Sequence, residues 1–421
     1  MHVLYFVQYF NLPDEPGGSR PYQFARTWVE AGHRVTVVTG MVNHKTLTVP
    51  ERYRGRLVVA EQVDGIRLLR TWSYAGIRGS FKKRLLNFLS YAATATLVGL
   101  VRAGRPDLVY ASSTPLTVGI PGWFLSLLRG APFFFEVRDL WPQSAVVAGV
   151  LGERSLVTRV ARFAARRFYR RASRVVAVTR GIGDGLREEG VPEEKVLFVP
   201  NGVDDWMLEA GDGPAPGPRE GFEVVYVGAH GKWNGLGQVL DAAKLIGPDA
   251  GIRFSFYGDG DEKAALEERA RAEGLAHVTF HGALPKKEAF QRIRRGSASI
   301  VVTWKHPFQR MVLANKIFDY LAAGRPVIVG AEGEMADLVR EAGCGVVVPP
   351  EDPPALAAAI REMAAKDPEE LARMGRAGRR YILERYQRRD LALRLLDEMI
   401  AVAGDGATPA AGPRLVGEGE R

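Results

Sequence analysis

Residues 299–329 read SIVVTWKHPFQRMVLANKIFDYLAAGRPVIV, and this stretch determines the predicted fold class. A β-rich run at 299–302 precedes an amphipathic segment with helical spacing at 315–323, and a second β-rich run follows at 326–329. A strand, a helix and a strand in this order form a parallel crossover unit, in which the helix packs on the sheet. We therefore predict an α/β fold.

The same alternation covers most of the chain, once in each half. Two such series predict two Rossmann-like domains in tandem. The predicted strands are 3–8, 34–39, 107–111, 132–137, 174–178, 196–199, 223–227, 253–257, 277–280, 299–302, 326–329 and 345–348. The predicted helices are 22–31, 81–102, 115–128, 156–170, 181–189, 237–245, 262–273, 286–294, 315–323 and 335–341.

A segment rich in proline, glycine and acidic residues separates the two halves. It covers residues 200–222 and includes GPAPGP at 213–218, a composition typical of a linker and surface loop. We predict a first domain at 1–199 and a second domain at 223–378. Residues 403–421 are rich in glycine, alanine and proline and are predicted to be a disordered tail.

Length and composition exclude several classes of protein. The chain has 421 residues, enough for two domains of roughly 150–200 residues each. Its one cysteine, Cys344, cannot form an internal disulfide or a cysteine-based zinc cage, which indicates a cytoplasmic protein. The N-terminus lacks the pattern of a signal peptide, and the apolar stretch 88–101 is shorter than the roughly 20 residues of a membrane span. We expect no spanning segment.

The net charge of +9 favours anionic partners, namely a phosphorylated small molecule, an anionic membrane surface or nucleic acid. The sequence has no zinc-finger spacing, no RNP-type aromatic strand and no GXXG clamp. Nucleic acid is therefore disfavoured.

In parallel sheets, ligands bind beyond the carboxyl ends of strands, where glycine-rich turns and helix N-termini face phosphate. The first predicted strand leads to Gly17 and Gly18, followed by Ser19-Arg20 before a helix. Two glycines permit close approach to a diphosphate, although the loop lacks the G-x-G-x-x-G dinucleotide pattern. A flexible loop that caps the helix is the alternative.

A second candidate site lies at 135–144, FEVRDLWPQS, after another predicted strand. It places Glu136, Arg138 and Asp139 beside aromatic residues, an arrangement that often holds a polar substrate. We favour a functional role for Asp139. An internal ion pair between Arg138 and Asp139 is the alternative.

In the second half, the turn YVGAHGKWNG at 226–235 follows a strand and opens a helix. The backbone at Gly228, together with His230 and Lys232, is expected to hold a phosphate or a sugar hydroxyl. A solvent-exposed turn histidine is the alternative for His230.

The helix at 315–323 begins with Asn315 as the expected N-cap, and Lys316 adds positive charge to its free N–H groups. Asp319 lies one turn further along, so that the helix start could bind a diphosphate while this carboxylate holds a ribose diol. A surface ion pair between Lys316 and Asp319 is the alternative, weakened by the apolar residues around it.

These motifs resemble glycosyltransferase family 4, of the GT-B fold, and most closely its O-antigen and colanic-acid branch. The resemblance covers nearly the whole chain. Its matching segments are QYF at 8–10 with Gly17-Gly18, GHRVTVVTG at 32–40, RDLWP at 138–142, VPNGVD at 199–204, NKIFDY at 315–320 and AGRPVI at 323–328.

The resemblance implies a retaining glycosyltransferase with two facing Rossmann-like domains, a nucleotide diphosphate sugar donor, usually UDP-linked, and no cofactor or essential metal. The first domain would be on the acceptor side, and a helix at 379–402 would cross back to it. Three groups of residues are implied. Catalytic residues would be Asp139, Lys316 and His230; donor contacts would be Gly17, Gly18, Gly228, Lys232, Asn315, Lys316 and Asp319; acceptor or sugar contacts would be Arg20, Arg138 and Asp139.

The chain also departs from the family pattern. Met311 occupies the position of the first glutamate of the E-x7-E pair, and Asp319 replaces the second. Ala229 and Asn234 stand roughly where the family has arginine and lysine, so His230, Lys232 or Lys316 would have to compensate. Asp259-Gly260-Asp261 resembles the metal motif of another glycosyltransferase fold, but Asp261 is explained as a helix N-cap, and we predict no metal site.

Two basic amphipathic segments, 82–89 and 162–171, are relevant to the identity of the acceptor. We expect the first to contact an anionic membrane, where a polyprenyl-diphosphate-linked acceptor would lie, and the second to pack on the sheet with its arginines solvated. Two rival functions stay open: a UDP-sugar epimerase of similar build and a non-catalytic nucleotide-sugar-binding protein.

Overall fold

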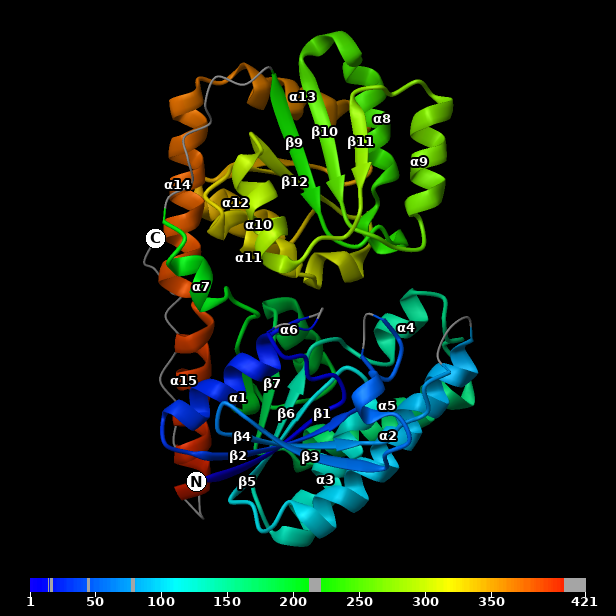
Figure 1. Ribbon diagram of the computed structural model, residues 1–421, viewed down its shortest axis with the longest axis vertical. Coiled ribbons are helices and arrows are strands. Elements are labelled where there is room, and N and C mark those ends of the chain that lie inside the picture. Colours follow the sequence, from blue (N-terminus) through cyan, green and yellow to red (C-terminus); the bar gives the residue numbers. More distant parts are fainter. Residues whose placement is uncertain (14, 16–17, 44–45, 77–79, 212–220, 405–421) are drawn as a thin grey trace. The chain divides into compact units, whose positions relative to one another are not determined.

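The computed structural model describes residues 1–13, 15, 18–43, 46–76, 80–211 and 221–404. The chain divides into two compact units, residues 1–201 with the chain from Arg388 onward, and residues 202–387. Each unit contains one sheet covered by helices (Figure 1). The predicted α/β class is confirmed.

The sheet of the first unit has the strand order β3-β4-β2-β1-β5-β6-β7-β8. Every neighbouring pair is parallel except β3 with β4. The strands are β1 (His2–Val7), β2 (Arg34–Gly40), β3 (Val58–Val63), β4 (Ile66–Thr71), β5 (Leu108–Ser112), β6 (Phe133–Val137), β7 (Arg174–Ala177) and β8 (Val196–Phe198).

The hairpin formed by β3 and β4 is absent from the sequence prediction. Asp64 and Gly65 connect the two strands with φ values of 48° and 76°. An Asp-Gly pair with both residues at positive φ forms the tight turn that antiparallel strands favour. The signal was therefore present in the sequence.

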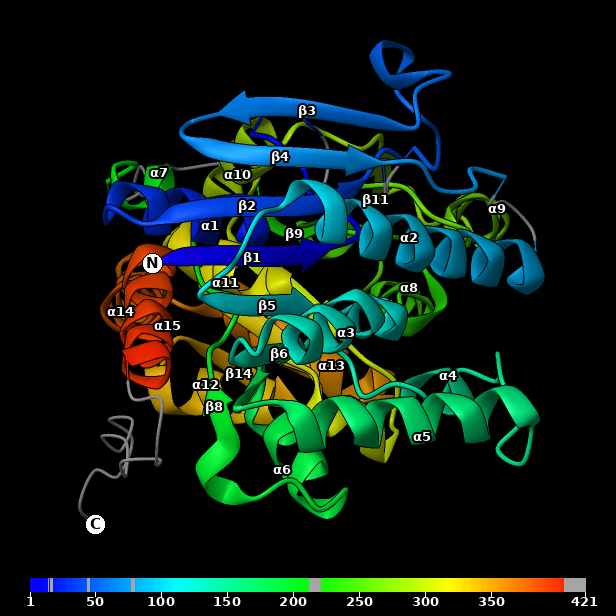
Figure 2. The same cartoon turned by 90° about the horizontal axis from the view of Figure 1, so that it is seen from below.

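Helices cover both faces of this sheet (Figure 2). Val3, Tyr5 and Val7 of β1 share a core with side chains of α1 and α15, whereas Phe6 faces Gly99 of α2 and Leu125 of α3. The helices are α1 (Arg20–Glu30), α2 (Phe81–Arg102), α3 (Gly119–Arg129), α4 (Gln143–Val147), α5 (Leu156–Arg171), α6 (Arg180–Glu188) and α15 (Arg388–Gly404).

Helix α2 is longer than the apolar stretch identified in the sequence. It has 22 residues, and an 18-residue window within it has a mean hydropathy of 1.3, so the helix is long and apolar enough to cross a membrane by length and composition alone. In the first unit it packs against α3, β2 and β4, with Tyr91, Ala95 and Gly99 buried. One side of the helix therefore belongs to the protein core.

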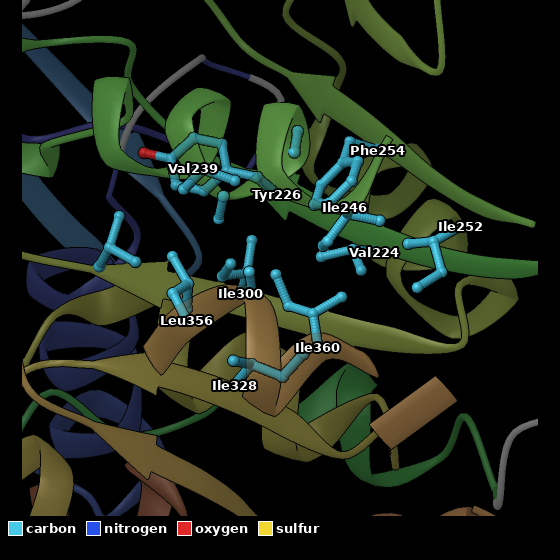
Figure 3. Close-up of a cluster of buried hydrophobic side chains, with 14 of the residues drawn as sticks. Val224, Tyr226, Val239, Ile246, Ile252, Phe254, Ile300, Ile328, Leu356 and Ile360 are labelled. Atoms are coloured by element: carbon cyan, nitrogen blue, oxygen red, sulfur yellow. The ribbon is translucent and has the colours of Figure 1, made fainter. Parts of the chain in front are cut away.

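The sheet of the second unit is entirely parallel, with the order β11-β10-β9-β12-β13-β14. Val224, Ile300 and Ile328 from three of its strands pack against Leu356 and Ile360 of α13 (Figure 3). The strands are β9 (Phe222–Val227), β10 (Ile252–Tyr257), β11 (Val278–His281), β12 (Ala298–Val302), β13 (Val327–Gly330) and β14 (Gly345–Val348). The helices are α7 (Asp205–Leu208), α8 (Gly237–Ile246), α9 (Lys263–Ala272), α10 (Lys286–Arg295), α11 (Asn315–Ala322), α12 (Glu334–Ala342), α13 (Pro353–Ala365) and α14 (Pro368–Arg385).

The C-terminal part differs from the single helix expected at 379–402. Helix α14 ends at Arg385 in the second unit, because Gln387 forms a parallel bridge with Val203 and the backbone N–H of Val203 donates to the carbonyl of Tyr386 at 2.8 Å. Helix α15 then packs on α1 in the first unit, where the indole of Trp28 donates to the carbonyl of Ala392 at 2.9 Å.

Two predicted boundaries also shift. Residues 202–211 of the expected linker belong to the second unit, where Val203 and Met207 are buried. Helix α15 continues through Gly404, past the expected start of the tail at 403, and residues 405–421 lie outside the described chain.

Candidate active site

A lysine and two hydrogen-bond acceptors meet at the carboxyl end of β9 and the start of α11. The Lys316 amine donates to the hydroxyl of Tyr226 at 2.7 Å and to the side-chain carbonyl of Asn234 at 2.6 Å. Tyr226 and Asn234 in turn both donate to the carbonyl of Ala229, at 2.7 and 2.9 Å. We call Lys316, Tyr226 and Asn234 the lysine cluster.

Burial controls the charge of this cluster. It lowers the pKa of Lys316 to about 7, and the amine lies 4.4 Å from the centre of the Tyr226 ring. An amine with this pKa gains a proton readily when an anion approaches, because the anion stabilises the charged form. The cluster is therefore suited to an anionic ligand such as a diphosphate.

Glycine at position 228 leaves room for the lysine. A Cβ atom there would lie 3.1 Å from both the Lys316 amine and the Tyr226 hydroxyl. This contact is tighter than van der Waals packing favours, so a side chain at 228 would displace the amine.

The start of α11 differs in detail from the prediction. Ala314, rather than Asn315, is the N-cap, and Asn315 is the exposed first residue of the helix. Asp319 lies 3.6 Å from the Lys286 amine, which also pairs with the buried carboxylate of Asp204. Asp319 is thus held by a lysine of α10, and the alternative pairing with Lys316 is not the arrangement found, since that amine faces Tyr226 and Asn234.

The position of His230 does not support the prediction that it is a catalytic group. Its side chain is fully buried among the rings of Tyr226, Phe256 and Phe280, and burial lowers its pKa. It is not the exposed turn residue of the alternative interpretation either. Among the described residues, neither ring nitrogen has a hydrogen-bond partner.

Lys232 is exposed, and its amine lies 5.1 Å from the Trp304 ring centre. His230, Lys232 and Lys316 were expected to compensate for the family arginine and lysine, which Ala229 and Asn234 replace here. Of these three residues, Lys316 is the one whose amine reaches Asn234.

The Asp-Gly-Asp segment belongs to a contact between two turns. The backbone N–H of His230 donates to the carbonyl of Asp259 at 2.9 Å, and a Cβ atom at Gly260 would lie 2.5 Å from the His230 carbonyl oxygen. Glycine is required there by close approach. Asp261 is not the N-cap of α9, since Glu262 holds that position. Within the described residues, no group of three His, Cys, Asp or Glu side chains could hold a metal ion.

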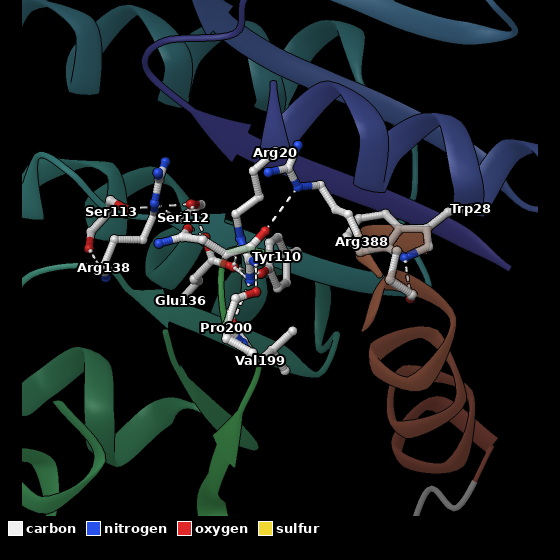
Figure 4. Close-up of polar contacts among 12 residues, drawn as sticks. Arg20, Trp28, Tyr110, Ser112, Ser113, Glu136, Arg138, Val199, Pro200 and Arg388 are labelled. Atoms are coloured by element: carbon white, nitrogen blue, oxygen red, sulfur yellow. Dashed lines mark hydrogen bonds and ion pairs between the residues drawn. The ribbon is translucent and has the colours of Figure 1, made fainter. Parts of the chain in front are cut away.

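In the first unit, Glu136 at the end of β6 is the centre of a buried network (Figure 4). Its carboxylate accepts hydrogen bonds from Tyr110 at 2.6 Å, Ser112 at 2.7 Å and Arg20 at 2.9 Å, and lies 4.0 Å from Arg138. Burial alone would raise the pKa of Glu136, but the two arginines and the Tyr110 hydroxyl outweigh it, and the pKa is lowered. The carboxylate is therefore charged at neutral pH.

The predicted contact of Arg20 with an acceptor is not supported by its position. Arg20 is buried, stacks on Phe24 at 4.2 Å and donates to the carbonyls of Val199 and Pro200 as well as to Glu136. The N–H groups of its guanidinium thus bind partners within the first unit. The side chain links the N-terminus of α1 to the end of the sheet of that unit.

Arg138 and Asp139 follow Glu136 in the turn before α4, and both are half-buried. The partner of Arg138 is Glu136 and not Asp139, in contrast to the alternative interpretation. Burial raises the pKa of Asp139. A partly accessible carboxyl group with a raised pKa, beyond the carboxyl end of a central strand, is a candidate for contact with a polar substrate.

Gly18 is exposed, and a Cβ atom at this position would meet nothing within 4 Å. Packing within the described chain therefore does not require glycine here. Gly17 lies outside the described residues.

Comparison with known proteins identifies the family. Residues 17–202 match the glycosyl transferase 4-like domain, and residues 221–366 match the glycosyl transferases group 1 domain. The chain belongs to glycosyltransferase family 4. This confirms the family predicted from the sequence motifs.

The relatives of this family 4 glycosyltransferase include two bacterial proteins. It is 27% identical over 351 residues to the putative colanic acid biosynthesis glycosyl transferase WcaI of Escherichia coli K12, over 80% of this chain and 85% of WcaI. It is 25% identical over 297 residues to the probable glycosyltransferase WbjE of Pseudomonas aeruginosa, over 68% of this chain and 72% of WbjE.

Solved structures with the same fold include sucrose-phosphate synthase from Thermosynechococcus elongatus, with a TM-score of 0.74, 18% identity and coverage of 96% of this chain and 100% of that one. Anabaena HepE in complex with UDP has a TM-score of 0.68 and 16% identity, and covers 95% of this chain and 100% of HepE. These likenesses confirm the predicted GT-B fold of the family 4 glycosyltransferase.

Proposed function

We propose that this family 4 glycosyltransferase moves a hexosyl or N-acetylhexosaminyl group from a UDP-linked sugar to a glycan or polyprenyl-diphosphate-linked acceptor in cell-surface polysaccharide synthesis. The lysine cluster is the observation that carries the proposal. It holds one cationic group beside the N-terminus of α11, where backbone N–H groups also favour an anion. The name of WcaI, a colanic acid biosynthesis glycosyl transferase, supports a role in polysaccharide synthesis, and the UDP complex of HepE supports a UDP-linked donor.

Lys316 would act on the leaving group. When the bond between the sugar and the diphosphate breaks, negative charge develops on the diphosphate, and a preorganised amine with neighbouring N–H groups stabilises it. We propose that this stabilisation replaces an essential metal and that no cofactor takes part.

The other residues have supporting roles in the proposal. Asp319 would hold the ribose, and the exposed Asn315 and the backbone at Gly228 would line the diphosphate. Lys232, which is exposed, would also contact the donor. In the first unit, Gly18 would adjoin the donor phosphate, while Asp139 and the partly exposed Arg138 would contact the transferred sugar or the acceptor.

We propose retention of the anomeric configuration and a cytoplasmic location, in line with a single cysteine, Cys344, that is buried and unpaired. The first unit would meet the inner face of the cell membrane through the start of α2, at 82–89.

The test is nucleoside diphosphate release from a panel of UDP-, GDP- and dTDP-sugars, with and without a polyprenyl-linked acceptor and with EDTA present. We expect release from a UDP-sugar that rises with acceptor and persists in EDTA, and NMR of the product would show retention. Conversion of the free UDP-sugar to an epimer without acceptor, or tight binding with no release from any donor, would contradict the proposal.

A further inference from the structure

The helices on one face of the first unit's sheet expose apolar side chains in stripes. On α2, the exposed residues Leu86, Leu89, Leu97 and Val101 recur at helical spacing, with Leu97 at 62% and Val101 at 70% exposure. They lie on the side of α2 away from its buried residues Tyr91, Ala95 and Gly99. The helix is therefore apolar on its solvent side as well as on its core side.

The two neighbouring helices repeat this feature. Helix α3 exposes Ile120, Phe124, Leu127 and Leu128, and α5 exposes Leu156, Val160 and Phe163, the last at 59%. Helix α3 packs against both α2 and α5 (Figure 2). The three helices thus lie side by side on one face of the sheet, and we call their exposed apolar side chains the three-helix face. The apolar exposure of α5 differs from the expectation that its apolar residues only pack on the sheet.

Positive charge surrounds these side chains, and the three helices contain no aspartate or glutamate. Lys82, Lys83 and Arg84 begin α2 and are exposed, and six arginines lie on α5. The guanidinium of Arg167 lies 4.9 Å from the centre of the exposed Phe163 ring. Arg166 pairs with Glu189, which follows α6. Most of the charge is therefore available to an external anion.

We propose that the three-helix face docks on an anionic lipid bilayer. Its apolar side chains would enter the boundary between headgroups and acyl chains, and its basic residues would contact the phosphates. The charge also argues against self-association, because a two-fold contact places the same surface on both sides and would bring the arginines of two α5 helices together.

The proposal extends membrane contact from the start of α2 to all three helices, and it does not depend on the donor-site chemistry. Binding to vesicles is measured without turnover. A failure here would remove the proposed membrane contact but leave the proposed transfer reaction intact, and an inactive enzyme that binds vesicles would leave this proposal intact.

The experiment is co-sedimentation of the full chain with phosphatidylcholine vesicles, with and without phosphatidylglycerol. We expect binding only to the anionic vesicles, weakened by added salt. The triple variant Leu97→Ser, Leu128→Ser, Phe163→Ser changes one exposed residue on each helix. It should lose about tenfold or more in vesicle affinity, since each side chain contributes part of its burial free energy.

The matched control is Leu57→Ser, an equally apolar and 73% exposed residue of the same unit outside the three helices, which should bind as the wild type does. Circular dichroism would show that both variants are folded. Equal vesicle binding of the triple variant and the wild type would overturn the proposal. So would a wild-type dimer in light scattering that the triple variant converts to a monomer, or vesicle binding that resists alkaline carbonate, which would indicate insertion of α2.

Discussion

The Lys316 amine lies 2.6 Å from the side-chain oxygen of Asn234, a residue 82 positions earlier in the chain. This hydrogen bond joins the start of α11 to the turn after β9. Asn234 also donates to the carbonyl of Ala229, so that the turn and the helix hold the amine between them. An amine that is fixed in place before the ligand arrives, and is protonated when the ligand binds, needs little reorganisation when negative charge develops.

The Lys316→Met variant should lose most of the transfer activity. Methionine keeps the apolar stem but removes the charge that we assign to the departing diphosphate. We expect kcat to fall by about 10²–10³, the usual cost of removing one charge-stabilising group. Steady-state nucleoside diphosphate release measures this. Lys244→Met, at an exposed lysine of α8, is the control and should retain activity. Equal activities of the two variants would contradict the assignment.

Donor affinity should depend on pH through Lys316. Burial lowers its pKa to about 7 in the empty site, and a bound diphosphate would raise it. The donor then binds the protonated form more tightly, so affinity should be constant below about pH 7 and fall above it by up to about tenfold per pH unit. Burial raises the pKa of Tyr226 and lowers that of His230, so neither should titrate between pH 7 and 9.

Calorimetry in two buffers of different ionisation enthalpy measures this dependence directly, because donor binding near pH 8 should take up a proton. The Lys316→Met variant should bind weakly, with no such uptake. Proton uptake that persists in this variant would assign the titration to another group.

The fold was predicted well from the sequence because it is defined by the patterns of strands and helices, and each pattern can be recognised within a short stretch of residues. The β-rich runs and the amphipathic helices recur in order, and only the packing of helices on sheets was needed to join them. The break between α14 and α15 was not predictable in the same way. It depends on the pairing of Gln387 with Val203, which are far apart in the sequence.

The candidate site was predicted in part. Lys316 was found because it lies in the first turn of a predicted helix, where its charge adds to that of the free N–H groups, but its partners were not assigned a role. Tyr226 looked like one more strand residue, and Asn234 looked only like a departure from the family lysine. His230 was assigned a ligand contact because its turn follows a strand, and Arg20 because the family resemblance implied it, while the structure buries both. Burial at a turn depends on neighbouring loops, which local patterns do not reveal.

The Glu136→Gln variant should destabilise the first unit. It leaves Arg20 and Arg138 without their shared counter-charge, and breaking a buried ion pair typically costs about 3–5 kcal/mol. Urea denaturation at pH 7 measures the loss, with the exposed Glu193→Gln as control.

The pH dependence of this loss follows from the lowered pKa of Glu136. The charged carboxylate stabilises the fold above its unfolded pKa, and this contribution disappears as the pH falls through the folded pKa. The wild type and Glu136→Gln should therefore converge in stability at acidic pH. A constant difference across pH would show that charge is not the cause.

The Asp139→Asn variant should lower kcat more than it changes donor affinity, since we place Asp139 near the transferred sugar or the acceptor rather than the diphosphate. Because burial raises its pKa, the acid limb of the wild-type kcat profile should lie above the range of an ordinary aspartate. Kinetics with varied donor and acceptor separate these effects. Asp184→Asn, at an exposed residue of the same unit, serves as control. A rise in donor Kd without loss of kcat would reassign the residue.

The Gly18→Ala variant tests whether glycine at this position is needed for contact with the donor or for folding. A Cβ atom at this position meets nothing within 4 Å of the described chain, so the free energy of unfolding should change by no more than about 0.5 kcal/mol. If a donor phosphate approaches the backbone here, as we propose, the added methyl group should weaken donor binding by about tenfold, the effect of roughly 1.4 kcal/mol.

Isothermal calorimetry of donor binding and urea denaturation measure the two quantities on the same samples. The control is Gly152→Ala, since the nearest atom to a Cβ there is 3.9 Å away and residue 152 is outside the proposed site. Weaker donor binding at unchanged stability in Gly18→Ala alone would support the phosphate contact. Unchanged binding would mean that Gly18 only allows the chain to turn toward α1, and the donor contacts would then be confined to the lysine cluster and its neighbours.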